Sequence, residues 1–480
     1  MRKPSVFLSL LTMGLLISML FLVISIFKDD ALSGAMQLVL LVAAAISSSI
    51  AVFYCGISWS AIEQRIAQNL FNIAPAILIL LLIGALAGSW MISGIIPTLI
   101  HYGLHIMHSN FFLVSTCVIC CIVSVMTGSS WTTIATIGVA LLGIGQVQGF
   151  SAGWIAGAII SGAYFGDKMS PISDTTVLTS TVTDTPLFTH IRYMLYTTVP
   201  SIAIALTVYA IAGYTREAPD TYQITAFAEA LKDKFNISAW LMIVPVVTGI
   251  LIAKKMSPIV VLFISSILAA VFAAFFQPHL LREIAGETDS GVVIACIKGA
   301  LTTLTGSTNI ETDNETLSGL ASTGGMGGMM YTIWLIICAI CFGGAMSASG
   351  MLGVITGLFQ RMMKGSTSTV TATVASGITF NITTADQFVS IVLNGEMFKD
   401  IYKKNGLENR LLSRTTEGSV TVTSPLIPWS SCGMTQATVL GVATLSYLPY
   451  CIFNIVSPLM NILVAATGYK IFKKDSTPPA

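Results

Sequence analysis

The 480-residue chain has 23 basic and 22 acidic side chains, so its formal net charge is +1 and only 9% of its residues are charged. An ordinary soluble domain has about 25% charged residues. Apolar residue types make up 54% of the chain, more than a soluble fold can cover with so few charges. The composition therefore excludes a soluble globular domain. A net charge near zero, without a basic cluster, also argues against a nucleic-acid partner.

Uncharged apolar stretches of about 20 residues recur along the chain, which is the length that crosses a bilayer as a helix. The first, residues 5–27, follows Arg2 and Lys3 and lacks a small-residue cleavage site, so we interpret it as a retained helix with a cytoplasmic N-terminus. We predict one polytopic, all-α membrane domain over residues 1–480. Further spans are predicted at 34–55, 73–96, 110–126, 131–146, 152–169, 190–213, 240–253, 257–276, 329–350, 367–380, 385–398, 408–423, 434–447 and 450–472. The shorter ones are interpreted as half-helices or hairpin arms.

Two parts of the chain repeat the same polar interruptions. In the first half, Ser170-Pro171 follows a polar break at Ser129. In the second half, Ser424-Pro425 follows a polar break at Thr384, and each second-half feature lies about 255 residues after its first-half counterpart. We therefore predict two repeats, residues 28–213 and 240–472. Broken helices expose backbone groups that must line protein or water rather than lipid. Paired breaks in repeats are how many secondary transporters build a site near the membrane midplane.

Loop charges favour an inverted relation between the repeats. With a cytoplasmic N-terminus, the loop carrying Glu63 and Arg65 lies inside, and the corresponding acidic loop Glu311–Glu315 is better placed outside. One loop disagrees with this topology, because the basic segment 399–414 would then fall outside.

The run 162–176, Gly-Ala-Tyr-Phe-Gly-Asp-Lys-Met-Ser-Pro-Ile-Ser-Asp-Thr-Thr, is the clearest candidate site. Ionisable groups at membrane depth cost several kcal/mol and usually have a functional reason. Gly166 allows a neighbouring backbone to approach closely, and Pro171 favours a helix break. Hydroxyl and carboxylate oxygens suit a small alkali cation, and either carboxylate could instead exchange a proton. A solvated polar loop is the alternative, which the matching Ser-Pro in the other half disfavours. The predicted Na⁺ or proton ligands here are Ser129, Ser130, Asp167, Ser170, Ser173, Asp174, Thr175 and Thr176.

The second break supplies the predicted counterparts Thr384, Asp386 and Ser424, with Pro425 as the helix breaker. Candidates for the wall of a substrate cavity are Lys168, Asn381, Asn394 and Trp429. Glu417 lies three residues after Arg414 and could pair with it on one helix face, as a structural or a functional group. His101, His105 and His108 share one helical face, where a wet interfacial surface is favoured over a metal or pH-sensing site.

The run 162–176, its continuation His190–Thr198 and the stretch Arg414–Gly433 resemble the NhaC family of bacterial Na⁺/H⁺ antiporters. The resemblance covers most of the chain. It implies a secondary transporter of the bacterial inner membrane that exchanges Na⁺ for H⁺, with no cofactor besides the transported ions. What the resemblance carries over is a set of cation-site or proton-site candidates, Asp167, Ser170, Ser173, Asp174, Thr175 and Thr176, with Asp174 as the central one. Asp386 and the Ser424-Pro425 turn are their counterparts in the second half.

Two alternatives remain on the sequence alone. Relatives of the resembled family also move malate against lactate, or an amino acid, and Val177-Leu178-Thr179 stands where the family often has Asn-Leu-Ala. A Na⁺- or H⁺-coupled exchanger of small organic anions or amino acids is therefore the runner-up. An intramembrane enzyme is disfavoured, because the chain lacks Gly-x-Gly-Asp, His-Glu-x-x-His and Gly-x-Ser-x-Gly motifs. The oligomeric state is left open, with a homodimer as one arrangement.

Overall fold

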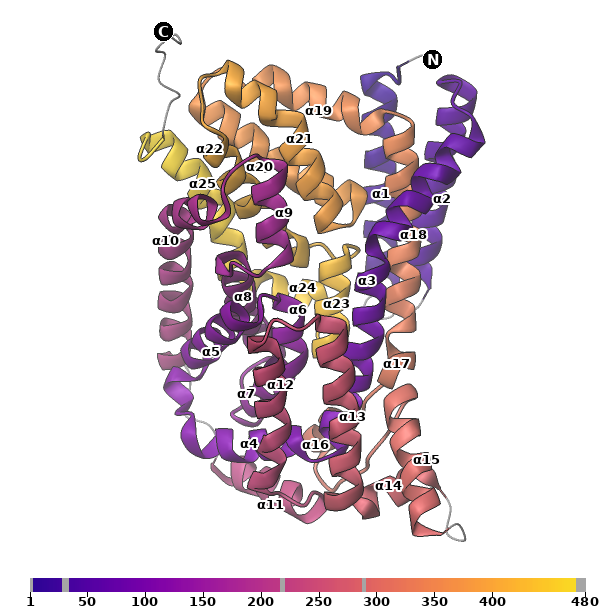
Figure 1. Ribbon diagram of the computed structural model, residues 1–480, viewed down its shortest axis with the longest axis vertical. Helices are drawn as coiled ribbons and strands as arrows, with labels where there is room; N and C mark the ends of the chain where they lie inside the picture. Colours follow the sequence, from indigo (N-terminus) through magenta and orange to yellow (C-terminus); the bar gives the residue numbers. More distant parts are fainter. Residues whose placement is uncertain (1–2, 28–33, 216–220, 287–290, 472–480) are drawn as a thin grey trace.

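The computed structural model describes residues 3–27, 34–215, 221–286 and 291–471, and these ranges are helical apart from turns, connecting loops and one antiparallel bridge between Thr308 and Thr323. Eight described helices are long and apolar enough to cross a membrane, and two further bent pairs raise that number to ten. The prediction of an all-α, multi-pass membrane protein is confirmed. Figure 1 shows the helices arranged along one long axis, with both marked chain ends at the same end of the molecule.

The helices of the first part of the chain are α1 (Val6–Phe27), α2 (Ala35–Ser49) with η2 (Ile50–Tyr54), α3 (Trp59–Ile92), α4 (Ile95–Ile106), η3 (Ser109–Phe111), α5 (Phe112–Thr127), α6 (Ser130–Thr133), η4 (Ile134–Gly138), α7 (Val139–Val147), α8 (Ala152–Met169), α9 (Asp174–Val182) and α10 (Leu187–Tyr214). Their ends follow local signals. The Ser58 hydroxyl caps α3 by accepting from the Ala61 amide, and Gly128 ends α5 in the left-handed conformation at φ 66°.

A connecting region follows, with α11 (Thr221–Lys234), η5 (Ala239–Met242), α12 (Ile243–Ala253), α13 (Pro258–Phe276), α14 (Pro278–Ala285), α15 (Val292–Thr305), α16 (Glu315–Ala321) and α17 (Gly325–Gly328). The last part holds α18 (Met330–Ala348), α19 (Met351–Met362), α20 (Ser366–Thr384), α21 (Gln387–Lys404), α22 (Asn409–Thr416), η6 (Glu417–Thr421), η7 (Ser424–Leu426), α23 (Ser431–Leu440), α24 (Thr444–Tyr447), η8 (Leu448–Tyr450) and α25 (Ile452–Thr467). The span predicted at 73–96 begins earlier, at Trp59, and the one predicted at 434–447 is divided between α23 and α24.

The same order of elements occurs twice. A long helix ends before a left-handed glycine, Gly94 after α3 and Gly350 after α18. A second left-handed residue, Gly128 or Ala385, then precedes a helix capped by Ser129 or Asp386. In Figure 1, α4 lies at the opposite end of the molecule from α19, so α3 and α18 run in opposite directions. An inverted repeat has this appearance, while the division at 28–213 and 240–472 stays a prediction.

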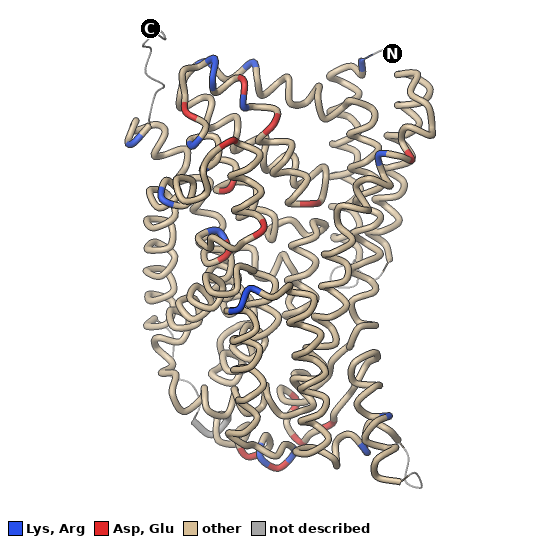
Figure 2. Tube along the Cα trace, in the orientation of Figure 1, with Lys and Arg blue, Asp and Glu red and all other residues tan. Residues whose placement is uncertain are grey.

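The basic loop 399–414 lies where the sequence did not place it. Helices α21 and α22, which flank this loop, are at the same end as both marked chain ends, whereas α16 with Glu315 is at the other end (Figures 1 and 2). The reason is the break at Ala385, which turns α20 back on itself as the hairpin α20–α21 and returns the chain to its starting side. The loop therefore agrees with a cytoplasmic N-terminus and the positive-inside rule.

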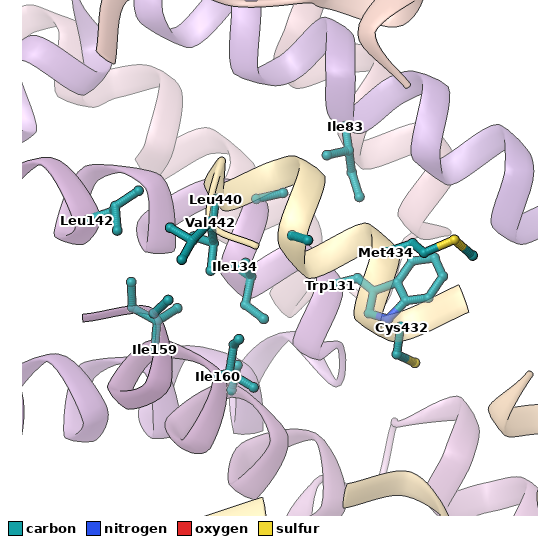
Figure 3. Close-up of a cluster of buried hydrophobic side chains, with 14 of the residues drawn as sticks. Ile83, Trp131, Ile134, Leu142, Ile159, Ile160, Cys432, Met434, Leu440 and Val442 are labelled. Atoms are coloured by element: carbon teal, nitrogen blue, oxygen red, sulfur yellow. The ribbon is translucent and has the colours of Figure 1, made fainter. Parts of the chain in front are cut away.

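The breaks of the two halves are packed against each other by apolar side chains. Figure 3 shows α23 between the first-half helices, with Trp131 beside Cys432 and Ile134 below Leu440. All four side chains are at least 90% buried. Without a strong hydrophobic force between helices in lipid, close van der Waals packing holds such elements together. This contact fixes the position of both breaks relative to each other.

Candidate functional site

Asp167 lies in the last turn of α8 and is only 5% exposed. Its Oδ2 accepts hydrogen bonds from the Ser130 amide at 3.2 Å and the Ser130 hydroxyl at 2.7 Å. Its Oδ1 accepts from the Ser173 hydroxyl at 2.6 Å. The carboxylate therefore joins the end of α8, the start of α9 and the N-terminus of the helical stretch 130–147, where unpaired amides favour negative charge.

Two glycines allow this geometry. A Cβ atom on Gly162 would lie 2.2 Å from the Cys117 carbonyl oxygen, and one on Gly166 would lie 2.5 Å from the Cys121 carbonyl oxygen. Only glycine permits backbones to approach so closely. Gly166 was predicted to allow close backbone approach near a helix break; the close approach is found, although Gly166 itself lies inside α8, three residues before the helix ends. Its role is to bring α8 against α5, directly before Asp167.

The first break itself is held by hydroxyl groups. Ser170 donates to the Val125 carbonyl oxygen at 2.8 Å, and Pro171 follows it where α8 has ended. Ser173 caps α9, accepting from the Thr176 amide at 3.4 Å. Thr176 donates to the carbonyl oxygens of Asp167 and Lys168 at 3.3 and 3.2 Å. Ser129 caps α6 and accepts from the Thr132 amide at 3.2 Å. These contacts satisfy the backbone groups that the break exposes.

Asp174, the central residue expected from the sequence, is close enough to Asp167 for their charges to interact, but no hydrogen bond of the described residues joins its carboxylate to this group. It is the first residue of α9 and its side chain is exposed. The carboxylate of Asp167, not that of Asp174, receives the hydroxyl groups of Ser130 and Ser173. Thr175, the next residue, points inward and is 2% exposed.

The second break places another buried carboxylate at a helix N-terminus. Asp386 caps α21, its Oδ1 accepting from the Val389 amide at 3.0 Å and its Oδ2 from the Ser431 hydroxyl at 3.2 Å. The Ser431 amide also donates to the Ala385 carbonyl oxygen at 2.7 Å. Thr384 donates to the Asp386 carbonyl oxygen at 3.1 Å. Ser424 and Pro425 form η7. The start of α23 is thus tied to the α20–α21 hairpin.

Three residues predicted to line a cavity bind backbone or neighbouring side chains instead. The Asn381 amide nitrogen donates to the Val420 carbonyl oxygen at 2.7 Å, and the Trp429 indole donates to the Ile382 carbonyl oxygen at 2.9 Å. Asn394 accepts from the Ser376 hydroxyl at 2.8 Å. In this conformation they hold the second break together.

Glu417 is a buried carboxylate whose hydrogen-bond partners differ from the one predicted from the sequence. It is fully buried, and its two oxygens accept hydrogen bonds from Thr175 at 3.1 Å and from Thr179 at 2.5 Å. The predicted pairing with Arg414 is wrong, since the Arg414 guanidinium lies 4.6 Å from the centre of the Tyr193 ring. The signal that identified Asp167, a carboxylate inside an apolar stretch, applies equally to Glu417.

Lys168 is a fully buried cation whose charge interacts with that of the buried Arg414. Its ammonium donates to the Ser457 hydroxyl at 3.3 Å. A Cβ on Gly418 would lie 3.2 Å from the Lys168 nitrogen, so the ammonium lies against the residue that follows Glu417. The region therefore holds two buried carboxylates and one buried ammonium.

Several buried side-chain oxygens in the described part of the second half have no hydrogen-bond partner. Among the residues that the structure describes, the buried side-chain oxygens of Asn381, Thr421, Ser424, Gln436, Asn454 and Asn461 have no hydrogen-bond partner. Hard cations bind such oxygens. Within the described ranges no group of three or more His, Cys, Asp and Glu residues is placed to hold a metal ion. The predicted face of His101 and His105 is internally bonded, with the His105 Nδ1 atom 2.7 Å from the His101 carbonyl oxygen.

A family model described as "Na+/H+ antiporter family" matches residues 3–184 and 162–469. The chain belongs to the Na⁺/H⁺ antiporter family. It is 36% identical over 421 residues to the Na⁺/H⁺ antiporter NhaC of Bacillus subtilis, covering 87% of this chain and 89% of that protein. The resemblance to NhaC is thereby confirmed. With its apolar helices, this family member is a multi-pass protein of the inner membrane.

Other members carry different substrates in their names. The malate-2H⁺/Na⁺-lactate antiporter of B. subtilis is 34% identical over 99% of this chain and 98% of its own length. The arginine/ornithine antiporter ArcD of Halobacterium salinarum is 33% identical over 99% of this chain and 94% of its own. A solved structure of Neisseria gonorrhoeae MtrF covers 89% of this chain and 94% of its own at 14% identity, with a TM-score of 0.39, too low to support an argument.

Proposed function

We propose that this antiporter exchanges cytoplasmic Na⁺ for external protons, and that Asp167 binds the two ions alternately. The observation that carries the proposal is the buried Asp167 carboxylate with hydroxyl groups on both of its oxygens. A hydroxyl group both donates and accepts, so Ser130 and Ser173 can turn their lone pairs towards a bound Na⁺. Without Na⁺, a proton on Asp167 neutralises the buried charge. Binding one ion therefore excludes the other.

Alternating access would come from moving one half of the chain against the other. The site lies where the two halves meet, since Asp167 belongs to the first half and α23, which packs against Trp131, to the second (Figure 3). The opposite directions of α3 and α18 support two inverted halves (Figure 1). Transporters of this kind open a fixed midplane site to one side at a time.

The test uses everted membrane vesicles from cells without their own antiporters, in which respiration builds a pH gradient that a fluorescent dye follows. Na⁺, Li⁺ and K⁺ are added in turn, with and without malate, lactate or amino acids. We expect Na⁺ alone to collapse the gradient. No response until an organic solute is present would overturn Na⁺/H⁺ exchange as the primary activity.

One observation favours the organic-anion exchanger as a second candidate. The Arg414 guanidinium is fully buried, and none of its three nitrogens has a hydrogen-bond acceptor in the described ranges. A buried arginine commonly binds a carboxylate in a two-point contact. The match to the malate-lactate antiporter also extends over 99% of this chain, against 87% for NhaC. The solute arms of the vesicle experiment decide between the two.

Replacing Asp174 with asparagine tests which carboxylate binds the ion. Because Asp174 is exposed and outside the hydrogen-bonded group, we expect Na⁺-dependent transport within about twofold of the unaltered protein, the effect of an exposed substitution worth under about 0.5 kcal/mol. The initial rate of dye recovery is compared at equal protein abundance in the membrane. A loss of transport would return the central role to Asp174 and contradict the assignment to Asp167.

A further inference from the structure

Glu417 is a buried carboxylate surrounded by hydroxyl groups, an environment that helix packing alone does not explain. It begins the π-helical segment η6, is fully buried, and accepts a hydrogen bond on each carboxylate oxygen from a hydroxyl group of α9. π-Helical turns inside helices frequently mark functional sites. A carboxylate held at this depth is costly, and the ion exchange at Asp167 described above does not use it.

Two hydroxyl groups lie between the two carboxylates, and when Asp167 carries a proton the three contacts form one continuous series of hydrogen bonds. Asp167 Oδ1 lies 2.6 Å from the Ser173 hydroxyl, which lies 3.1 Å from the Thr175 hydroxyl, which lies 3.1 Å from Glu417 Oε1. Each intervening hydroxyl can accept one proton while giving up another. The series therefore has the composition of a proton relay, with an acid at each end.

The face of α9 that contacts Glu417 carries further hydroxyl groups towards the end of the helix. Thr175, Thr179 and Thr183 follow one another at intervals of four residues, so they share one helix face, and each is at most 2% exposed. Thr183 donates to the Thr179 carbonyl oxygen at 2.7 Å and to the Thr185 hydroxyl at 3.3 Å. One helical turn separates the Thr179 and Thr183 side chains, so a proton route along α9 requires a water molecule between their two hydroxyls.

Thr185 opens into a surface pocket of about 280 Å³. Its wall also includes Asp184, Lys403, Glu408 and Arg410. The pocket lies between the start of α10 and the α21–α22 connection, towards the end where both chain ends are marked (Figure 1). That end is the cytoplasmic one if the N-terminus is cytoplasmic, as the loop charges indicate.

We propose that Glu417 is a second proton-binding group of the transport cycle, which takes the proton from Asp167 through Ser173 and Thr175 and passes it along α9 to this pocket. The inference rests on the proposed exchange at Asp167. In the first step the O–H bond of protonated Asp167 breaks and one forms at Ser173. Ser173 gives its own proton to Thr175, and Thr175 gives its proton to Glu417 Oε1. Asp167 becomes a carboxylate ready for Na⁺, both hydroxyls are restored, and Glu417 becomes the acid.

The competing explanation is that Glu417 only balances the buried charge of Lys168, whose ammonium lies against Gly418. A purely structural carboxylate would affect every transport mode equally when replaced. A proton relay affects only the modes that move a proton. Na⁺/Na⁺ exchange, which requires Asp167 but no proton transfer, therefore separates the two explanations.

The experiment compares Glu417→Gln with the unaltered protein in everted vesicles at equal membrane abundance. Glutamine keeps the shape of glutamate but cannot take up the proton. We expect Na⁺/H⁺ exchange to fall at least about tenfold, a modest loss for removal of a proton-transfer group, while exchange of radioactive Na⁺ for unlabelled Na⁺ stays within about threefold. Retained Na⁺/H⁺ exchange overturns the proposal, and so does loss of both modes. Failure of the proposed function is distinct, since the unaltered protein would then show no Na⁺-driven proton movement.

Two substitutions on α9 test the route without touching either carboxylate. Thr179→Val removes the hydroxyl that donates to Glu417 Oε2 and keeps the side-chain shape, so it should slow Na⁺/H⁺ exchange and spare Na⁺/Na⁺ exchange. Thr181→Val is the matched control, because Thr181 is exposed and donates only to the Val177 carbonyl oxygen of its own helix. Equal rates for the two variants would contradict the route, even if Glu417→Gln fails to reach the membrane.

Discussion

Replacing Asp167 with asparagine is expected to lower both Na⁺/H⁺ exchange and Na⁺/Na⁺ exchange by about 100-fold or more. Asparagine fills the same space between Ser130 and Ser173, so the fold should persist, but it carries neither the charge that balances Na⁺ nor a titratable proton. Losing an interaction with a charged group at a buried site costs about 3 kcal/mol, which corresponds to about 100-fold. Initial rates of radioactive Na⁺ uptake and of dye recovery measure the two modes.

Asp174→Asn is the matched control, because it removes a carboxylate seven residues away on the exposed face of α9. Size-exclusion profiles of the two purified variants establish that both are folded. Na⁺/Na⁺ exchange by Asp167→Asn within tenfold of the unaltered protein would show that the ion binds elsewhere. The proposal for Asp167 would then be withdrawn.

Gly162→Leu is expected to lower the stability of the folded protein strongly, far more than Gly249→Leu. A Cβ at this position would lie 2.2 Å from the Cys117 carbonyl oxygen and 2.8 Å from the Cys120 Cβ, and backbone atoms cannot turn aside as a flexible side chain can. Helices α5 and α8 would have to separate, at a cost of about 3 kcal/mol or more. The measurement is the temperature at which detergent-solubilised protein loses its single size-exclusion peak.

Gly249→Leu is the control for this substitution. Gly249 lies in α12, and no atom outside its own helix lies within 4 Å of the position its Cβ would occupy. Both variants add the same apolar side chain to a helix, so only the contact with a facing backbone differs between them. Equal thermal stability of the two proteins would refute the idea that close α5–α8 packing supports the site.

Sequence patterns predicted the parts of the fold that depend on local chemistry. Apolar stretches placed most of the long helices. Pro171 follows the end of α8 and Pro425 lies in the 3-10 segment η7, so both prolines marked departures from α-helical geometry. The helices α4 and α19 were missed, since each is a short segment that begins at a left-handed glycine in the middle of an apolar run. The sidedness of the 399–414 loop could not be decided from the sequence, because a hairpin and a full crossing have the same hydropathy.

The site was harder to predict, because it depends on contacts between residues far apart in the chain. Glu417 has a basic neighbour three residues earlier, yet its partners Thr175 and Thr179 are more than 230 residues away. Asp167 and Asp174 lie in the same polar run, and the sequence favoured Asp174 as the central residue. Only the packing of α8 against α5 turns Asp167 inward and leaves Asp174 outside.

The glycine contact of α8 has a thermodynamic consequence. Gly166 touches α5 one residue before Asp167, so the carboxylate is in position only while the two helices are joined. An ion bound to Asp167 therefore favours the assembled state over any state in which the helices separate. By thermodynamic linkage, the melting temperature should rise with the logarithm of the Na⁺ concentration once that concentration exceeds the dissociation constant. Na⁺ is then a folding ligand as well as cargo, and melting curves become a binding assay that needs no membrane.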